Sequence, residues 1–230
     1  MNRLAVLHTV HFLADRFKTM LRERLPELDA FHMLDESLLQ DLLRHGASPA
    51  ITRRVVTFAT LAADAGADLI LFTCSSTSPA VDVARRVIAT PILKIDDPMA
   101  ERAVTLGRRI GILCTTSSTQ GPSADLVREH ATRLAREVAI EPHLVAGAFQ
   151  ALSSGEREEH DRLVCDAAAD LGRRNDVVVL AQASMAHLAD RLQTALQVPV
   201  LSSPPLCIDA LVQRYGRAKR TSNRVDRPQA

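Results

Sequence analysis

Aromatic residues are scarce in this chain: they make up 3% of its 230 residues, with no Trp and one Tyr. Proteins that stack single-stranded nucleic acid or sugars on exposed rings need several such residues, so the composition argues against that class. The formal net charge is only +1 at pH 7. Because nucleic acids and anionic membranes attract basic proteins, the sequence offers no electrostatic basis for either partner.

Paired cysteines and glycine-rich phosphate loops are absent as well. The cysteines are Cys74, Cys114, Cys165 and Cys207. They are well separated and none belongs to a CxxC pair, so the sequence indicates neither a zinc site nor a disulfide framework, and we expect no metal. Neither GxGxxG nor the P-loop pattern occurs, which disfavours nucleotide cofactors.

Long apolar runs and a signal peptide are also missing. No apolar stretch approaches the length of a membrane span, and Asp15 and Arg16 interrupt the N-terminal segment where a signal peptide needs an apolar core. We therefore expect a cytoplasmic protein without a membrane partner, in which the thiols stay reduced. The polar, basic segment 218–230 is expected to be a disordered tail.

Short apolar runs alternate with longer amphipathic runs along the rest of the chain. The runs that predict strands are 4–10, 30–34, 68–74, 91–96, 109–115, 138–145, 176–182 and 199–203. The runs that predict helices are 11–24, 36–44, 49–65, 79–89, 97–107, 120–135, 154–173, 185–196 and 204–217. This alternation predicts an α/β protein with parallel sheets covered by helices on both faces.

The two halves of the sequence also resemble each other. DAGADLILFTCSSTSPAVDVARRVIATPILKI in the first half matches the pattern of LGRRNDVVVLAQASMAHLADRLQTALQVPVLSS in the second. Each segment has an Asp before an apolar strand, a polar turn, an Ala-rich helix and a strand that starts at Pro. We expect two similar flavodoxin-like lobes, one formed by 1–96 plus 204–217 and the other by 97–203, and their strand-end turns line one cleft if the lobes face each other.

Polar turns follow several of the expected strands. In LILFTCSSTSP (69–79) an apolar strand leads directly into Cys74 and a series of hydroxyl residues. Ligands of open α/β sheets bind at the carboxyl ends of strands, and free N–H groups with short hydroxyl side chains suit a carboxylate. The residues expected to bind such a substrate are Thr9, Ser75, Ser76, Thr77, Thr115, Thr116, Ser117 and Ser184.

These motifs resemble the aspartate/glutamate/hydantoin racemase superfamily over nearly the whole chain, to about Tyr215. Cys74 in FTCSSTSP resembles the first-lobe cysteine of that family. VVVLAQASMAHLA (177–189) resembles the second-lobe motif, which hydantoin racemases write close to VLGCAGMADLA, and GILCTTSST (111–119) resembles the carboxylate-binding loop. The resemblance implies two lobes with the active site in the cleft between them, no cofactor, and one cysteine in each lobe working as a two-base pair.

The chain departs from this pattern at Gln182, where the second cysteine would stand. A carboxamide cannot exchange a proton near neutral pH, so we expect Cys74 to act alone, its pKa lowered by the helix N-terminus that follows, while Gln182 orients the substrate. His8 is either a base or substrate ligand near Cys74 or a satisfied histidine at a strand end. His187 replaces the missing cysteine only if its side chain turns into the cleft.

The sequence thus predicts a cofactor-independent isomerase or racemase-like enzyme that transfers a proton next to the carboxylate of a small acid. Two alternatives stay open: a lyase that decarboxylates a malonate-type acid with stereospecific protonation, and a catalytically silent relative that binds a carboxylate. The three cysteines other than Cys74 are expected to be small buried side chains. The expected partner is a small carboxylate substrate, and a homo-oligomer is compatible with the sequence.

Overall fold

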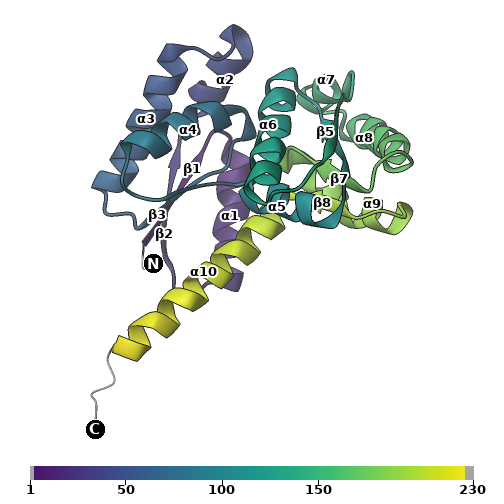
Figure 1. Cartoon of the computed structure of the whole chain (residues 1–230). Helices are drawn as coiled ribbons and strands as arrows, with labels where there is room; N and C mark the ends of the chain where they lie inside the picture. The colour runs from purple at the N-terminus through teal and green to yellow at the C-terminus, as the bar shows by residue number, and fades with distance from the viewer. Residues whose placement is uncertain (1–2, 226–230) are drawn as a thin grey trace.

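The computed structural model describes the backbone of residues 3–225 and the side chains of residues 3–216. Its first lobe is a four-stranded parallel sheet flanked by helices (Figure 1). The strands are β1 (Arg3–His8), β2 (Asp29–Leu34), β3 (Leu69–Phe72) and β4 (Ile92–Lys94). The helices are α1 (His11–Arg24), α2 (Glu36–His45), α3 (Pro49–Asp64), the short 3-10 helix η1 (Ser75–Thr77) and α4 (Ser78–Val87). The strand order is β2-β1-β3-β4.

The second lobe holds another four-stranded parallel sheet. Its strands are β5 (Arg109–Cys114), β6 (Ala139–Leu144), β7 (Val177–Leu180) and β8 (Val200–Ser202). Its helices are α5 (Asp97–Leu106), α6 (Ser117–Arg133), α7 (Ala148–Ser153), α8 (Arg157–Gly172), the 3-10 helix η2 (Ala183–Leu188) and α9 (Ala189–Ala195). The strand order is β6-β5-β7-β8, which repeats the order of the first sheet and confirms the expected fold class.

The two lobes also share local details. The side chain of Asp68 accepts a hydrogen bond from the Arg3 backbone N–H at 3.0 Å, and Asp176 accepts the corresponding bond from Arg109 at 2.9 Å. Leu7 on β1 is the register partner of Phe72, and Leu113 on β5 is the register partner of Leu180. Cys74 lies two residues after Phe72, and Gln182 lies two residues after Leu180. The two side chains therefore occupy equivalent positions in the two lobes.

The central strands are buried on both sides. β3 reads LILF and β7 reads VVVL, and every residue of both is buried, because helices cover both faces of each sheet. Apolar side chains fill the space between each sheet and its helices on either face. Within the described part of the chain, no helix has both the length and the apolar character needed to span a bilayer.

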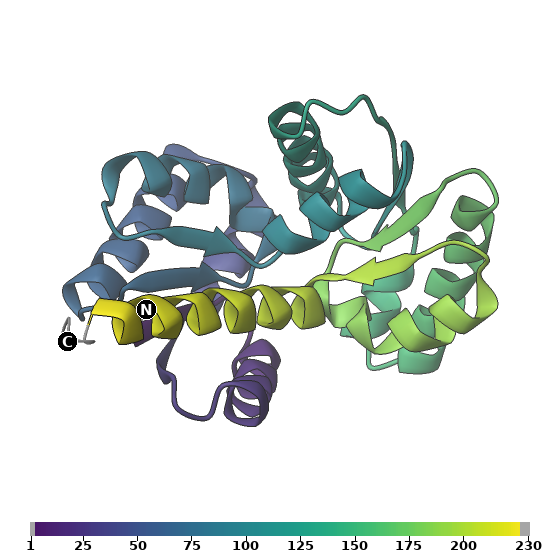
Figure 2. The same ribbon diagram turned by 60° about the horizontal axis from the view of Figure 1, so that its bottom comes forward.

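The last helix, α10 (Ser203–Val225), starts at the end of β8 and returns to the first lobe. Its residues Cys207, Ile208 and Leu211 belong to the same apolar cluster as Phe17 of α1. Figure 2 shows α10 as a long yellow helix that runs from the second lobe along the first. The helix is longer than the expected 204–217, so residues 218–225 of the expected disordered tail are helical here. Residues 226–230 lie outside the described residues.

Candidate active site

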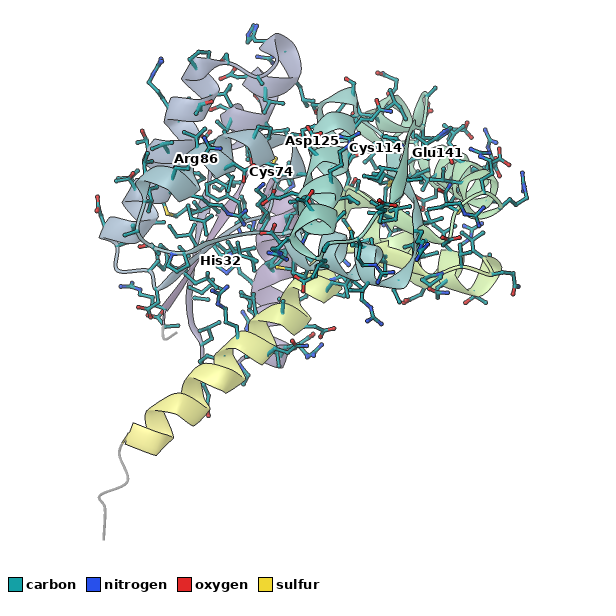
Figure 3. All side chains as sticks on the ribbon, viewed as in Figure 1. His32, Cys74, Arg86, Cys114, Asp125 and Glu141 are labelled. Carbon is teal, nitrogen blue, oxygen red and sulfur yellow. The ribbon has the colours of Figure 1, made fainter. Side chains whose placement is uncertain are left out.

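A cleft of about 150 Å³ opens between the lobes at the carboxyl ends of the strands. Its polar lining comes from turns of both lobes: Thr9, Thr73, Cys74, Ser75, Ser76, Thr116, Thr119, Gln182 and Ser184. The rest of the lining is Val10, Phe12, Leu13, Leu39, Leu43, Phe149, Leu152 and Ala183. In Figure 3 the Cys74 label lies where the first lobe faces the second, whereas Cys114 lies within the second lobe.

Cys74 is the one cysteine that lines this cleft among the described residues. The hydroxyl group of Thr9 and the backbone N–H groups of Ser76 and Thr77 interact with its sulfur. These donors lower the pKa of the thiol, but burial raises it by more, so the net pKa is above its ordinary value. The expected lowering of the Cys74 pKa is therefore wrong, because the sulfur loses more hydration than the turn restores. The thiol is protonated at neutral pH.

The side chain of Gln182 is held by hydrogen bonds to the turn that follows β5. Its Oε1 accepts hydrogen bonds from the Thr115 backbone N–H at 2.5 Å and from the Thr115 hydroxyl at 3.0 Å. Its Nε2 donates to the Thr116 hydroxyl at 3.4 Å. The amide oxygen and both Thr115 donors are thus occupied within the protein, and the Gln182 NH₂ group is the part that can donate to a molecule in the cleft.

A series of hydroxyl groups crosses from one lobe to the other. The Ser76 hydroxyl on η1 lies 3.1 Å from that of Ser118 and 3.2 Å from that of Thr119 on α6. The Thr119 hydroxyl is also 2.9 Å from that of Thr116. Since each hydroxyl donates one hydrogen bond and accepts two, this series can rotate to donate toward an anion without leaving its own oxygens unpaired.

His8 lies outside the cleft lining and is fully buried. Its Nδ1 is 2.9 Å from the Thr73 hydroxyl, which itself donates to the Leu7 carbonyl, so the ring donates from Nδ1. Its Nε2 then accepts from His32 Nδ1 at 2.9 Å. Burial, and to a smaller degree His32, lower the pKa of His8 to about 3. Of the two sequence alternatives, the structure shows the satisfied histidine and not a base beside Cys74.

His187 turns away from the cleft. Its Nδ1 donates to the Ser184 carbonyl at 2.9 Å, and its Nε2 lies 2.8 Å from Asp161 Oδ1 on α8. The condition under which His187 would replace the missing cysteine is therefore not met. His160 also contacts Asp161, and the potential ligand atoms of His160, Asp161 and His187 all lie within 4.8 Å of one another. Imidazole and carboxylate groups are donors that suit zinc, but this cluster lies outside the cleft lining.

The structure brings most of the expected binding residues together. Those that line the cleft with Cys74 and Gln182 are Thr9, Ser75, Ser76, Thr116 and Ser184. Thr115 and Ser117 line an adjacent hollow instead, together with Thr116, Leu43 and Phe149. Thr77 is buried beneath the cleft, where its hydroxyl donates to the Cys74 carbonyl at 2.8 Å.

The apolar side of the cleft was missed from the sequence. It comes mainly from α1, α2 and α7, and α7 itself was not expected. The sequence does contain one signal for α7, which is a glycine on each side of it, Gly147 and Gly155. In the structure these glycines have φ values of 79° and 82°, a conformation that favours glycine. Phe149 and Leu152 reach the cleft from this helix.

The remaining cysteines lie away from the cleft. Cys114 and Cys207 are buried, as expected, whereas Cys165 on α8 is partly exposed. Burial raises the pKa of Cys114 to about 12. These thiols are protonated at neutral pH, and none of them lines the cleft.

The fold and the site together define a two-lobed α/β protein with one thiol in an inter-lobe cleft. The family model described as "Asp/Glu/Hydantoin racemase" matches residues 9–211. The chain belongs to this family.

Individual relatives are more distant. A protein of Schizosaccharomyces pombe that is named as uncharacterised is 27% identical over 150 residues, which span 64% of this chain and 63% of that protein. The glutamate racemase of Francisella tularensis, solved with D-glutamate, has a TM-score of 0.72 and 14% identity over 95% of this chain and 82% of its own. A mutant of arylmalonate decarboxylase has a TM-score of 0.61 and 16% identity over 93% of each chain. At these identities the structural likeness is one of fold.

Proposed function

We propose that this protein is an enzyme that transfers a proton at the carbon next to the carboxylate of a small acid, with Cys74 as its single acid–base group and without a cofactor. The observation that carries the proposal is the asymmetry of the cleft. Cys74 presents a thiol from the first lobe, and Gln182 presents a carboxamide at the equivalent position of the second. A carboxamide cannot supply or remove a proton near neutral pH, so the chemistry belongs to one face of the substrate.

The proton is transferred from the Cys74 sulfur. Because burial raises its pKa, the group enters the reaction as a neutral thiol, a proton donor. The S–H bond breaks toward the carbon of an enediolate, the carbon gains the proton, and the bonding electrons stay on sulfur. The resulting thiolate is stabilised by the Ser76 and Thr77 N–H groups and the Thr9 hydroxyl. Gln182 Nε2 and the Ser76 and Thr116 hydroxyls would hold the carboxylate.

In an isomerase, the thiolate form of Cys74 first removes a proton from the carbon next to the carboxylate, which gives the enediolate and the neutral thiol. The thiol then returns this proton to another carbon of the conjugated anion on the same face, and the thiolate is regenerated. The decarboxylase alternative is favoured by one observation, which is that the thiol is protonated at rest. In that reaction the bond from the carbon to one carboxylate breaks, carbon dioxide leaves, and the electron pair forms the enediolate that Cys74 protonates. Water then returns a proton to the thiolate. The fold shared with arylmalonate decarboxylase supports this reading by analogy.

The test is a screen of small carboxylic acids and malonates in D₂O, followed by proton NMR. We expect deuterium at the carbon next to the carboxylate, with carbon dioxide released in the decarboxylase case. Cys74→Ser should remove the activity. Cys165→Ser, which changes a thiol on α8 outside the cleft, is the matched control and should leave it unchanged.

The opposing outcomes are equally definite. Activity that survives in Cys74→Ser would overturn the role of the thiol. A wild-type protein that binds acids but incorporates no deuterium and releases no carbon dioxide would be the catalytically silent relative.

A further inference from the structure

The lining of the cleft carries no formal charge. Among the residues that the structure describes, none of those lining the cleft is Asp, Glu, Lys, Arg or His. The adjacent hollow, which shares Leu43, Thr116 and Phe149 with the cleft, has no charged lining residue either. The polar groups that face a ligand are therefore neutral hydroxyls, amide N–H groups, the Cys74 thiol and the Gln182 carboxamide.

These groups accommodate an anion better than a cation. Gln182 Nε2 donates, and the hydroxyls of Ser76, Thr116 and Thr119 can turn their hydrogens toward a carboxylate. An ammonium group finds only neutral acceptors there, because no carboxylate side chain lines the cleft to offset the loss of its hydration. A free amino acid would bring that ammonium into the site.

The opposite wall of the cleft is apolar and partly open. Phe12 on α1, Leu43 on α2 and Phe149 on α7 are 46%, 41% and 40% exposed, and all three line the same cleft. Leu39 and Leu152 continue the same surface from α2 and α7. α1 and α2 belong to the first lobe and α7 to the second, so this wall joins the lobes around the mouth of the cleft.

From these two surfaces we infer that the substrate is a carboxylic acid without an amino group, which carries an aromatic or branched aliphatic substituent next to the carboxylate. The inference deepens the proposed function and rests on the same cleft. The carboxylate lies against the neutral donors near Cys74, and the substituent covers the wall formed by Phe12, Leu43 and Phe149. The family is named for aspartate and glutamate, and this cleft lacks the charged partners for either of those zwitterions.

The direct test is binding of matched ligands to Cys74→Ser by calorimetry, so that no turnover occurs. Phenylacetate and phenylglycine have the same ring and carboxylate, and phenylglycine adds only the ammonium. We expect phenylacetate to bind at least about tenfold more tightly than phenylglycine, and more tightly than acetate. Equal or tighter binding of phenylglycine or glutamate would overturn the inference.

Variants of the apolar wall give the second arm. Phe149→Ala and Phe12→Ala should each weaken phenylacetate binding about tenfold while acetate binding stays the same. Leu61→Ala is the matched control, since Leu61 on α3 is 53% exposed and lies outside the cleft lining. Unchanged phenylacetate binding in both Phe variants would contradict the assigned wall.

Failure of this inference is distinguishable from failure of the proposed function. Tight phenylacetate binding without deuterium exchange or carbon dioxide release for any acid would support the inferred ligand class and contradict the proposal that the protein is an enzyme. Cys74-dependent deuterium exchange into glutamate without phenylacetate binding would support the proposed enzyme and contradict the inferred substrate class.

Discussion

The two lobes share one architecture and differ in the groups they bring to the cleft. Each sheet has the same strand order, and each third strand ends in a 3-10 helix. The first lobe places a thiol at that point, in Cys74, and the second lobe places a carboxamide, in Gln182. The repeated backbone thus builds both sides of the cleft, whereas the proposed chemistry depends on one side chain in each repeat.

A second difference concerns buried titratable groups. The first lobe has His8 at the end of β1 with His32 beside it on β2, and the equivalent positions of the second lobe are Cys114 and Pro142. The first lobe also has Asp96 after β4, where the second has Pro204 after β8. We therefore expect the stability of the first lobe to depend more strongly on pH.

The largest expected effect on activity comes from making the lobes chemically alike. Gln182→Cys places a thiol opposite Cys74, and it should allow proton exchange on the second face of the substrate, at a rate about a hundredfold or more above the wild type. The measurement is deuterium incorporation into each enantiomer of an acid that the D₂O screen identifies. Gln193→Cys, on α9 outside the cleft lining, is the control and should have no effect. A silent Gln182→Cys would mean that position 182 does not face the reacting carbon.

Acid should destabilise the first lobe before the second. The pKa of His8 is lowered to about 3 and that of His32 to about 4, in both cases mainly by burial. The unfolded histidines take up protons near their ordinary pKa of 6.5, so stability is present above that pH and is lost as the pH falls toward 4. The loss should approach about 6 kcal/mol at pH 4. Hydrogen exchange at pH 7 and pH 4.5 should show greater loss of protection in β1 and β2 than in β5 and β6.

The control for the acid prediction is His32→Gln. This variant keeps a side-chain donor for His8 and removes one of the two titrating rings. It should lose less stability on acidification than the wild type. Equal loss of protection in both sheets, or no effect of His32→Gln, would contradict the assignment of the acid sensitivity to this pair.

Asp96 should act in the opposite direction. It is 2% exposed, and burial raises its pKa to about 6, although the nearby hydroxyls of Ser75 and Ser203 lower it somewhat. The unfolded carboxyl ionises near 3.8, so its ionisation costs native stability as the pH rises from 4 to above 6. Asp96→Asn should therefore stabilise the protein by up to about 3 kcal/mol at pH 8 and by little at pH 4. Urea unfolding at both pH values measures the difference, and an equal effect at both would contradict it.

The smallest effect is expected for the orienting amide. Gln182→Ala removes one donor to the substrate carboxylate and frees the Thr115 N–H and hydroxyl. Ligand binding should weaken by about 1 kcal/mol, while the Cys74-dependent step continues. Calorimetry with phenylacetate measures the change, and Gln193→Ala is the control. Complete loss of turnover in Gln182→Ala with unchanged binding would assign Gln182 a chemical role.

The sequence was sufficient for the elements with strong patterns. β3 and β7 are continuous apolar runs, and the Asp residues before them repeat at equivalent positions, so the two-lobed α/β fold followed from the sequence. The strand-end turns with Cys74 and Gln182 followed in the same way, because parallel strands bring their carboxyl ends to one edge.

Other properties depended on tertiary contacts that the sequence does not encode locally. The pKa of Cys74 is decided by burial against the hydrogen bonds of the turn, and only packing fixes that balance. The choice between the alternatives for His8 and for His187 depended on Thr73, His32 and Asp161, which hold the two rings. These partners are distant in sequence or on other elements. The apolar wall was missed because it comes from three separate helices, including the short α7.

The most direct test of the central claim is the stereochemistry of proton delivery. The acid that exchanges fastest in the D₂O screen, or the product of the malonate that loses carbon dioxide fastest, is isolated and its deuterated carbon is assigned by chiral analysis. If Cys74 is the single acid, deuterium enters from one face and one stereoisomer accumulates. Equal deuteration of both faces by the wild-type protein would show a second acid in the cleft and would contradict the division of roles between Cys74 and Gln182.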